Sequence, residues 1–409
     1  MAINQADTVL AAGTLRRAQW AVNAAFFANG FVVGHWAPKI PVLVERLGIS
    51  ESVLGQMIIL FGLGALVALI VGAWLVTKYG SVTIVRWTSL MLAPSLLLLT
   101  LTPTVFTTCI AMLWLGVFLG AMDNAMNANG VVVEVALDRP VMSSYHGFWS
   151  LGGVIGGLTG GALIVWFGEL GHSIIVLLLV LAVVLWAWPN YMSDHHMDAE
   201  FEANAKAAGV ENVSRGMPKS IGIYLLGVVT MLSFAPEGTI IDWSALYLKD
   251  ELGAPLIVSG YAVAAFSATM ALMRFFGDSI RERMGDRKTF IISCVIAGFG
   301  LFLGGIADTF LWACFGFLIS GLGMANVVPV LFSTAGRYPG VRPSIGIAII
   351  TAFGYGGLLF IPALVGFIAE EYSIAIIYVG WAFIVGTIAL LGFGLPHLRE
   401  KKSTIQADQ

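Results

Sequence analysis

The chain is a series of long apolar segments separated by short clusters of polar, glycine and proline residues. A helix needs about 20 apolar residues to cross a hydrocarbon core about 30 Å thick, and each segment meets or approaches that length. The pattern therefore predicts twelve transmembrane helices, at 18–42, 53–77, 82–101, 104–132, 143–167, 171–191, 219–248, 256–280, 288–306, 310–335, 343–369 and 373–396.

The basic residues predict how these helices are oriented. Seventeen of the 21 Lys and Arg residues fall at one end of the predicted spans, and only Lys39, Arg46 and Lys249 fall at the other. Cytoplasmic loops are enriched in Lys and Arg, so we expect both termini to be cytoplasmic and the protein to lie in the inner membrane. The remaining basic residue, Arg274, falls inside a predicted span.

Composition favours a membrane protein over the soluble classes. The 409 residues are 58% hydrophobic and 11% charged, whereas soluble domains carry about 25% charged residues. The net charge of -3 gives no basis for nucleic-acid binding. Three cysteines in apolar runs (Cys109, Cys294 and Cys314) predict neither a disulfide framework nor a metal site, and we expect no cofactor. Arg16 and Arg17 end a polar start that has no cleavage site, which predicts that the first helix is retained.

The longest polar stretch divides the chain into two similar parts. We expect residues 193–218 to form a cytoplasmic linker between an N-terminal six-helix bundle (1–192) and a C-terminal one (219–409). His195 and His196 lie in this linker, where a solvated pair is a better interpretation than a metal site.

A glycine pattern repeats between the two parts. Four glycines of the first part recur in the second at an offset of 205 residues, namely Gly48, Gly55, Gly72 and Gly80 as Gly253, Gly260, Gly277 and Gly285. Two related six-helix halves are typical of transporters, whose substrate binds near the bilayer midplane between the repeats.

Two short loops carry the residues of a family resemblance. The loop after the second span reads Thr77-Lys78-Tyr79-Gly80, and the loop after the eighth contains Arg281, Glu282, Arg283 and Gly285. Both are similar to the loop signature of the major facilitator superfamily, although Thr77 replaces its acidic residue. The resemblance implies an all-α fold of twelve transmembrane helices in two pseudo-symmetric six-helix bundles, a monomer, and gating roles for the loop residues Lys78, Gly80, Glu282, Arg283 and Gly285.

Within that superfamily, other segments resemble the fucose-permease branch and the MosC/YbjJ-type membrane proteins of bacteria. Gly30-Phe31 with Pro41, Asp123 through Asn127 and His146 through Gly152 are similar to the fucose-permease branch. Trp36-Ala37-Pro38, Asp123 through Asn127 and Met142 through Gly147 are similar to the MosC/YbjJ-type proteins. MosC members accompany rhizopine metabolism, so the resemblance implies a polyhydroxylated solute that is sugar-, inositol- or rhizopine-like. Ala37 stands where the fucose permeases carry an acidic residue, so proton coupling must use other acids.

Asp123 and two amides share the fourth span. Charged groups inside a membrane are costly and usually mark a pathway or an ion relay. Residues four apart share a helix face, so Asp123 and Asn127 can address one ligand, and we predict proton coupling by Asp123 with solute binding by Asn124 and Asn127. The structural alternative is a network of hydrogen bonds that holds helices together.

Two further ionisable groups extend the predicted coupling site. Glu237 follows Pro236 in the seventh span, and a helix broken by proline is tolerated in a membrane where it lines a cavity. His146 opens the fifth span and titrates near neutral pH, so it is a candidate relay to Asp123 or a structural histidine.

Several residues are expected to bind solute or to lie at a gate. Asp242 and His35 are predicted near the external mouth, each followed by a tryptophan. Trp36 and Trp243 can stack on a sugar-like ring or belong to the interfacial aromatic belt. Asn326 is expected to line the pathway. Arg274 is expected to gate it or, more simply, to snorkel to the inner surface.

The leading hypothesis is a secondary transporter that moves a small polar solute by alternating access, coupled to protons. The chain has no phosphate-binding loop motif, which argues against direct ATP use. A proton-driven efflux antiporter is the alternative, because the glycine pairs Gly152-Gly153, Gly156-Gly157 and Gly160-Gly161 resemble the signature of drug exporters. A membrane-bound enzyme of sugar or inosamine metabolism and a receptor or channel are the other classes, and no nucleophile with its base or metal cluster supports an enzyme.

Overall fold

The computed structural model describes residues 5–139, 141–193, 218, 220–339, 341 and 343–394, and these residues form helices and no strands. The first half contains α1 (Gln5–Leu47), α2 (Glu51–Tyr79), α3 (Ser81–Leu92), α4 (Ser95–Leu101), α5 (Val105–Leu137), α6 (Met142–Ala187) and the turn η1 (Trp188–Asn190). The second half contains α8 (Ile221–Leu246), η3 (Tyr247–Glu251), η4 (Leu256–Val258), α9 (Tyr261–Met284), α10 (Asp286–Gly305), α11 (Phe310–Gly336), α12 (Pro343–Gly356), η5 (Gly357–Leu359), α13 (Ile361–Glu371) and α14 (Ile374–Gly394).

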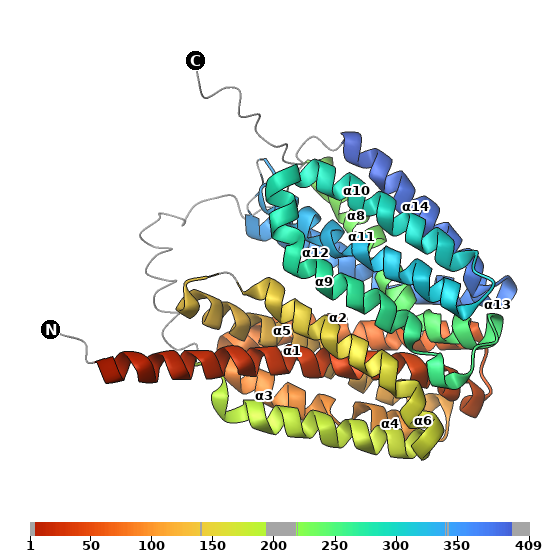
Figure 1. Cartoon of the computed structure of the whole chain (residues 1–409), viewed down its shortest axis with the longest axis horizontal. Helices are drawn as coiled ribbons and strands as arrows, with labels where there is room; N and C mark the ends of the chain where they lie inside the picture. The colour runs from red at the N-terminus through yellow and green to blue at the C-terminus, as the bar shows by residue number, and fades with distance from the viewer. Residues whose placement is uncertain are drawn as a thin grey trace.

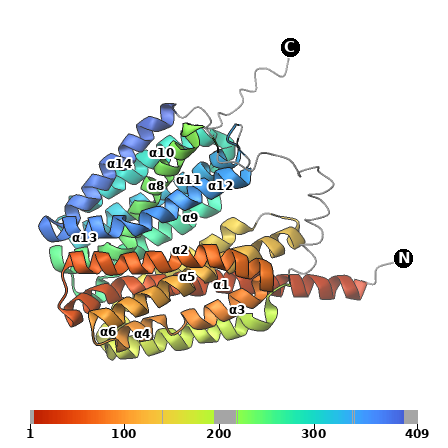
Figure 2. The same ribbon diagram turned by 180° about the vertical axis from the view of Figure 1, so that it is seen from behind.

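The helices fall into two groups that lie side by side. Figures 1 and 2 show α1–α6 together in one group and α8–α14 in the other. The linker expected at 193–218 and its His195-His196 pair lie outside the described residues, except for Ser193 and Pro218. The same is true of Lys219, Arg342 and the C-terminal basic residues, so the domain boundaries stay a prediction.

Ten helical segments of the described chain are long and apolar enough to cross a membrane. One of them, Met142–Asn190, contains two of the predicted spans, because Gly168 adopts a left-handed backbone (φ 72°) and folds α6 into two arms. The predicted third span is α3 plus α4, interrupted at Pro94, and the predicted eleventh is α12 plus η5 and α13. With α1, these segments correspond to the twelve predicted spans.

Helix α1 is not among these ten segments, and polar side chains line its inner face. Lys39 is fully buried, and its Nζ lies 2.8 Å from Glu169 Oε1 and 2.5 Å from the Thr100 hydroxyl. His35 Nδ1 lies 3.0 Å from His172 Nε2, so α1 is joined to the second arm of α6 by two polar contacts. Lys39 was counted at the external end of the first predicted span, and its partner Glu169 explains why this lysine can be buried.

The glycine repeat corresponds to matched geometry in the two halves. Gly80 and Gly285 both have positive φ (81° and 80°), and each amide donates to a carbonyl four residues back at 2.8 Å. Gly48 and Gly253 also share positive φ (60° and 64°). Positive φ favours glycine because it has no Cβ, so these positions are constrained by the same turns in both halves.

Paired glycines give the first arm of α6 two smooth faces. Gly152, Gly156 and Gly160 pack on α1, and a methyl group at Gly156 would lie 2.8 Å from the His35 amide nitrogen. Gly153, Gly157 and Gly161 pack on the other half, and a methyl group at Gly157 would lie 2.7 Å from the Gly260 carbonyl oxygen. One face therefore serves the bundle and the other serves the contact between the halves.

A second close contact joins α2 to α13. A methyl group at Gly55 would lie 2.5 Å from the Pro362 carbonyl oxygen, and Gly366 packs against the Glu51 backbone. The Ser52 amide donates to Glu370 Oε2 at 3.0 Å, and Lys249 Nζ lies 3.3 Å from Glu45 Oε2. These contacts lie at the end of the molecule predicted to be external, so the halves are closed together there.

Candidate functional site

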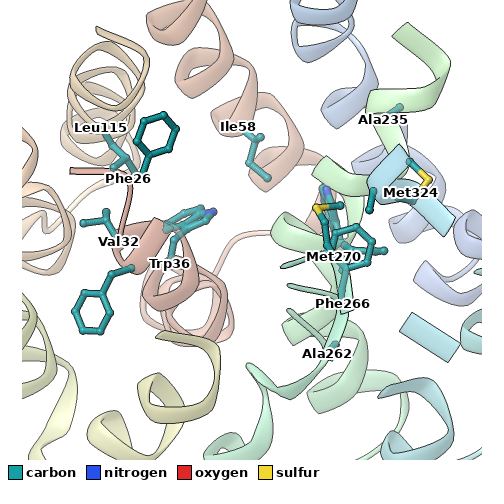
Figure 3. Packing of buried hydrophobic residues seen from close by; sticks show 14 of the residues in the cluster. Phe26, Val32, Trp36, Ile58, Leu115, Ala235, Ala262, Phe266, Met270 and Met324 are labelled. Carbon is teal, nitrogen blue, oxygen red and sulfur yellow. The ribbon is translucent and has the colours of Figure 1, made fainter. Parts of the chain in front are cut away.

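A cavity of about 200 Å³ lies between the two halves, and both halves line it. Figure 3 shows Trp36 among buried side chains of one half, with Phe266, Met270 and Met324 grouped across from it in the other. The first half contributes Val32, Val33 and Trp36 of α1, Phe61 of α2, Leu115 and Leu119 of α5 and Trp149 of α6. The second contributes Phe234, Glu237, Gly238, Ile241 and Asp242 of α8 and Gly354 and Tyr355 of α12.

Glu237 and Arg274 form the charged part of the cavity wall. Arg274 Nη2 lies 4.0 Å from Glu237 Oε1, and both side chains are largely buried. Arg274 Nη1 also donates to the Ser150 hydroxyl at 2.8 Å, and the guanidinium lies over the Trp149 ring at 5.8 Å. Arg274 therefore connects an acid of its own half to α6 of the other half. The expected snorkelling of Arg274 to the inner surface is wrong, because Glu237 and Ser150 hold its guanidinium inside the protein.

Trp149 is fixed by an amide that the sequence reading overlooked. Its indole Nε1 donates to Asn29 Oδ1 at 2.9 Å, and the Asn29 amide donates to the Leu119 carbonyl oxygen at 3.3 Å. Asn29 precedes Gly30 in the middle of α1, so a polar residue deep in the first span was the available signal. The contact sets the plane of an aromatic ring at the cavity wall.

Asp123 faces the second half through a tyrosine. Its carboxylate makes a polar contact with the Tyr355 side chain of α12. The Asn127 amide donates to Asp123 Oδ1 at 3.3 Å and to its backbone carbonyl oxygen at 2.8 Å. Because Tyr355 also lines the cavity, Asp123 is connected to the cavity through Tyr355. Sequence reading missed Tyr355, since a tyrosine in an apolar span looks like a packing residue.

The predicted tryptophans have different positions. Trp36 lines the cavity, and its Nε1 donates to Asp242 Oδ1 at 3.0 Å across the two halves. Trp243 is 1% exposed and packs beside a separate small cavity of about 30 Å³ that it shares with Asp242. Neither tryptophan lies in an exposed aromatic belt, so that alternative is wrong for both. Only Trp36 faces the main cavity.

Asn124 and Asn326 lie between helices of the same half rather than at the cavity. The Asn124 amide donates to the Leu69 carbonyl oxygen at 3.1 Å and packs over Gly72. Asn326 is 3% exposed, and its Oδ1 lies where a side chain on Gly277 would be. Gly72 and Gly277 are repeat partners, so each half places an asparagine over a glycine of a neighbouring helix. Neither residue lines the main cavity, in contrast to their predicted role.

His146 and His35 do not join the acids of the cavity in the described structure. His146 packs edge-on against the Phe26 ring at 5.1 Å, and no hydrogen bond or ion pair in the described residues links it to Asp123. His35 is fully buried and contacts His172 within the first half, instead of lying at an external mouth. The predicted relay between His146 and Asp123 is therefore absent from this conformation.

The two short loops have the same backbone geometry at Gly80 and Gly285 but different charged contacts. Lys78 lies over the rings of Trp74 and Tyr79, at 4.8 and 5.1 Å. In the second loop, the buried Asp286 accepts from Arg281 Nε at 2.9 Å and from Arg337 Nη2 at 2.6 Å. Gly80 and Gly285 form the turns described above, and Glu282 and Arg283 lie in the last turn of α9. The gating roles of these residues stay a prediction.

No group of three or more metal-ligating side chains occurs in the described part of the chain. Two related bundles of membrane helices, with a small and mainly apolar cavity between them that carries two acids and a tyrosine, are typical of secondary transporters.

Comparison with known proteins agrees with that class. The chain matches the family model of the Major Facilitator Superfamily over residues 22–235 and 223–409, and it belongs to that superfamily. The superfamily consists of transporters, so the protein is a transporter and not an enzyme, and it spans the membrane several times.

Three relatives match along nearly the whole chain. An uncharacterized MFS-type transporter of Yersinia pestis is 30% identical, covering 91% of this chain and 94% of its own. An uncharacterized transporter of Sinorhizobium fredii is 32% identical, covering 90% and 95%. The membrane protein MosC of Rhizobium meliloti is 27% identical, covering 87% and 84%.

Solved structures share the fold. The D-xylose-proton symporter superposes with a TM-score of 0.72 at 14% identity, covering 94% of this chain and 98% of that one. The nucleoside transporter NupG superposes with a TM-score of 0.66 at 13% identity, covering 92% and 98%.

Proposed function

We propose that the protein is a proton-coupled transporter of a small polyhydroxylated solute, with the cavity between the halves as the solute site. The observation that carries the proposal is the wall of that cavity, where two acids, a tyrosine hydroxyl and two indole rings converge from opposite halves. Binding pockets for drug-sized ligands measure about 300–1,000 Å³, so a cavity of about 200 Å³ suits a smaller molecule.

The lining chemistry fits a ring that carries hydroxyl groups. Trp36 and Trp149 offer flat apolar surfaces for one face of such a ring. Glu237, Asp242 and Tyr355 offer acceptors and a donor for hydroxyl groups. The likeness to MosC and the shared fold with a D-xylose-proton symporter support a sugar-, inositol- or rhizopine-like solute.

Glu237 and Asp123 are the proposed proton carriers. Glu237 can hold either a proton or the guanidinium of Arg274, so protonation would weaken a contact that extends through Arg274 to Ser150 of the other half. Asp123 would act in the same way through Tyr355. Proton binding would thereby change the strength of contacts between the halves, which is what coupling to alternating access requires.

Transport by purified protein in proteoliposomes tests this proposal. Counterflow with inositols, inosamines and hexoses would identify the solute. Asp123→Asn and Glu237→Gln should abolish proton-driven accumulation and retain counterflow, because exchange needs no net proton movement. Asp308→Asn, which removes an exposed carboxylate at the predicted external end, is the matched control. Unchanged proton-driven accumulation in both variants would contradict the coupling assignment.

An efflux antiporter is the second candidate, because the glycine pairs of α6 pack against the other half through Gly157 and Gly161. Direction is tested with the same liposomes by imposing the pH gradient both ways. Accumulation when the lumen is more alkaline than the outside supports a symporter, because protons enter with the solute. Accumulation when the lumen is more acidic supports an antiporter, because protons leave as the solute enters.

A further inference from the structure

Two adjoining grooves on the first half lie away from the cavity between the halves. One, of about 450 Å³, is apolar and is bordered by Trp20 and Phe27 of α1, Phe148 of the first arm of α6 and Trp186 of the second arm. The other, of about 500 Å³, continues it toward the predicted cytoplasmic end and is bordered by Arg16 and Arg139. Trp20, Asn23 and Phe148 border both, so the two form one continuous groove.

The groove is apolar at one end and basic at the other. Arg16 precedes the apolar part of α1, and Arg139 lies in the turn between α5 and α6, where Glu134 caps the start of α6. No acidic side chain borders either part, and no ion pair in the described chain involves either arginine. Arg139 makes only a long contact to Gln19 Oε1, at 3.4 Å. Two guanidinium groups are therefore available to an anion at the mouth.

A buried amide marks the junction of the two parts. Asn23 is 4% exposed and borders both, yet its Oδ1 has no hydrogen-bond partner in the described residues. Leaving a buried polar group unpaired is unfavourable, so an amide kept here points to a partner that is not part of the chain. Asn23 lies two helical turns from Arg16, about 10 Å deeper along α1.

We propose that this groove binds an anionic phospholipid of the inner leaflet, with one acyl chain along the Trp20, Phe148 and Trp186 walls and the phosphate between Arg16 and Arg139. The polar linkage between the phosphate and the acyl chain then passes Asn23, and a half-turn of the Asn23 amide places its NH2 group where it can donate to an ester carbonyl oxygen. The order of apolar wall, amide and paired guanidinium groups matches the order of acyl chain, ester linkage and phosphate in such a lipid. A free phosphate would use the arginines and leave the aromatic walls and the amide empty.

Native mass spectrometry of the delipidated full-length protein tests the proposal, with phosphatidylglycerol and phosphatidylethanolamine added in turn. The wild type should retain phosphatidylglycerol in preference. Arg16→Gln with Arg139→Gln should weaken that binding about 30-fold, since each basic residue near a phosphate contributes about a fivefold factor. Arg17→Gln, the neighbouring exposed arginine outside the groove, is the matched control and should bind like the wild type.

A second variant tests the apolar part without changing charge. Ala182→Phe fills the groove between Trp20 and Trp186 and should displace the lipid while both arginines remain. Inorganic phosphate should not compete with the lipid. The proposal is overturned if the double arginine variant binds phosphatidylglycerol as the wild type does, if Arg17→Gln loses as much, or if both lipids bind equally. Tm measurements confirm that each variant is folded.

Discussion

The indole nitrogen of Trp36 donates a 3.0 Å hydrogen bond to the carboxylate of Asp242, and this bond joins the two halves of the transporter. Both residues are buried, and both border the central cavity. Trp36 follows His35 in α1, and Asp242 precedes Trp243 in α8, so equivalent segments of the repeat meet at this point. In the proposed transport cycle, this bond is present in the conformation described here and would have to break when the external end opens.

Replacing Trp36 with phenylalanine keeps an aromatic ring and removes the donor. We expect the closed external end to lose about 1–2 kcal/mol of stability, a shift of about 5- to 30-fold toward the outward-open form. Maleimide labelling of Ala264→Cys reports this shift in a background without the native cysteines, because Ala264 is buried at the contact with Gly157. Equal labelling rates with and without the Trp36→Phe substitution would count against the bond as a lock.

Replacing two neighbouring glycines of α6, Gly156 and Gly157, should affect stability and transport differently. Gly157→Leu places a side chain between the halves, so transport should be lost and the Tm retained, with the external end held open. Gly156→Leu places it between α1 and α6 within one bundle, and overpacking of this kind costs about 1–3 kcal/mol or more. Thermal unfolding and labelling of the Ala264→Cys reporter separate the two outcomes. A Tm loss as large in Gly157→Leu as in Gly156→Leu would contradict the division into two faces.

Arg274 and Glu237 should depend on each other. Arg274→Met leaves Glu237 buried without its cation, and breaking a buried ion pair costs about 3–5 kcal/mol. Adding Glu237→Gln removes the unpaired charge, so the double variant should regain stability and counterflow but not proton-driven accumulation. Tm and counterflow across the four combinations measure the coupling. Additive losses in the double variant would mean that the two side chains act independently.

Asn124 and Asn326 should be structural residues of the two halves. Removing one hydrogen-bonding side chain between membrane helices costs about 0.6–2 kcal/mol. Asn124→Ala and Asn326→Ala should therefore lower the Tm and leave the solute Kd unchanged. Asn127→Ala, which removes a partner of Asp123, should change coupling with a smaller effect on the Tm. A larger solute Kd in Asn124→Ala would support the solute-binding role that was predicted from the sequence.

The sequence was sufficient to predict the membrane-spanning helices and the glycine repeat, whereas the functional roles of the site residues stay predictions. Glu237 borders the cavity, where a helix broken by proline suggested a lining residue, whereas Asp242 borders the same cavity although it was predicted near the external mouth. The rotation of each helix could not be predicted, since these helices are apolar all round and carry no stripe to mark an inner face. For that reason Asn124 and Asn127, three residues apart, were given one role, although one contacts Leu69 and the other Asp123.

Partners distant in sequence explain the other misses. Lys39 looked external until its contact with Glu169, 130 residues away, accounted for its burial. Arg274 looked like a residue that snorkels to the surface, because neither Ser150 nor Glu237 is near it in the chain. Pairings of this kind arise only when separate helices pack together, so no local pattern records them.

The absence of side chains along Gly153, Gly157 and Gly161 has a mechanical consequence. Where large side chains such as leucine interdigitate, two helices can separate only after those side chains move out of each other's grooves, and the energy barrier rises with each one. Two backbones that contact each other directly, with no side chains between them, can separate or slide without any side chain having to change its rotamer. A transporter that must separate and rejoin its halves in every cycle would do so faster across such a smooth contact, and a single added methyl group would obstruct it.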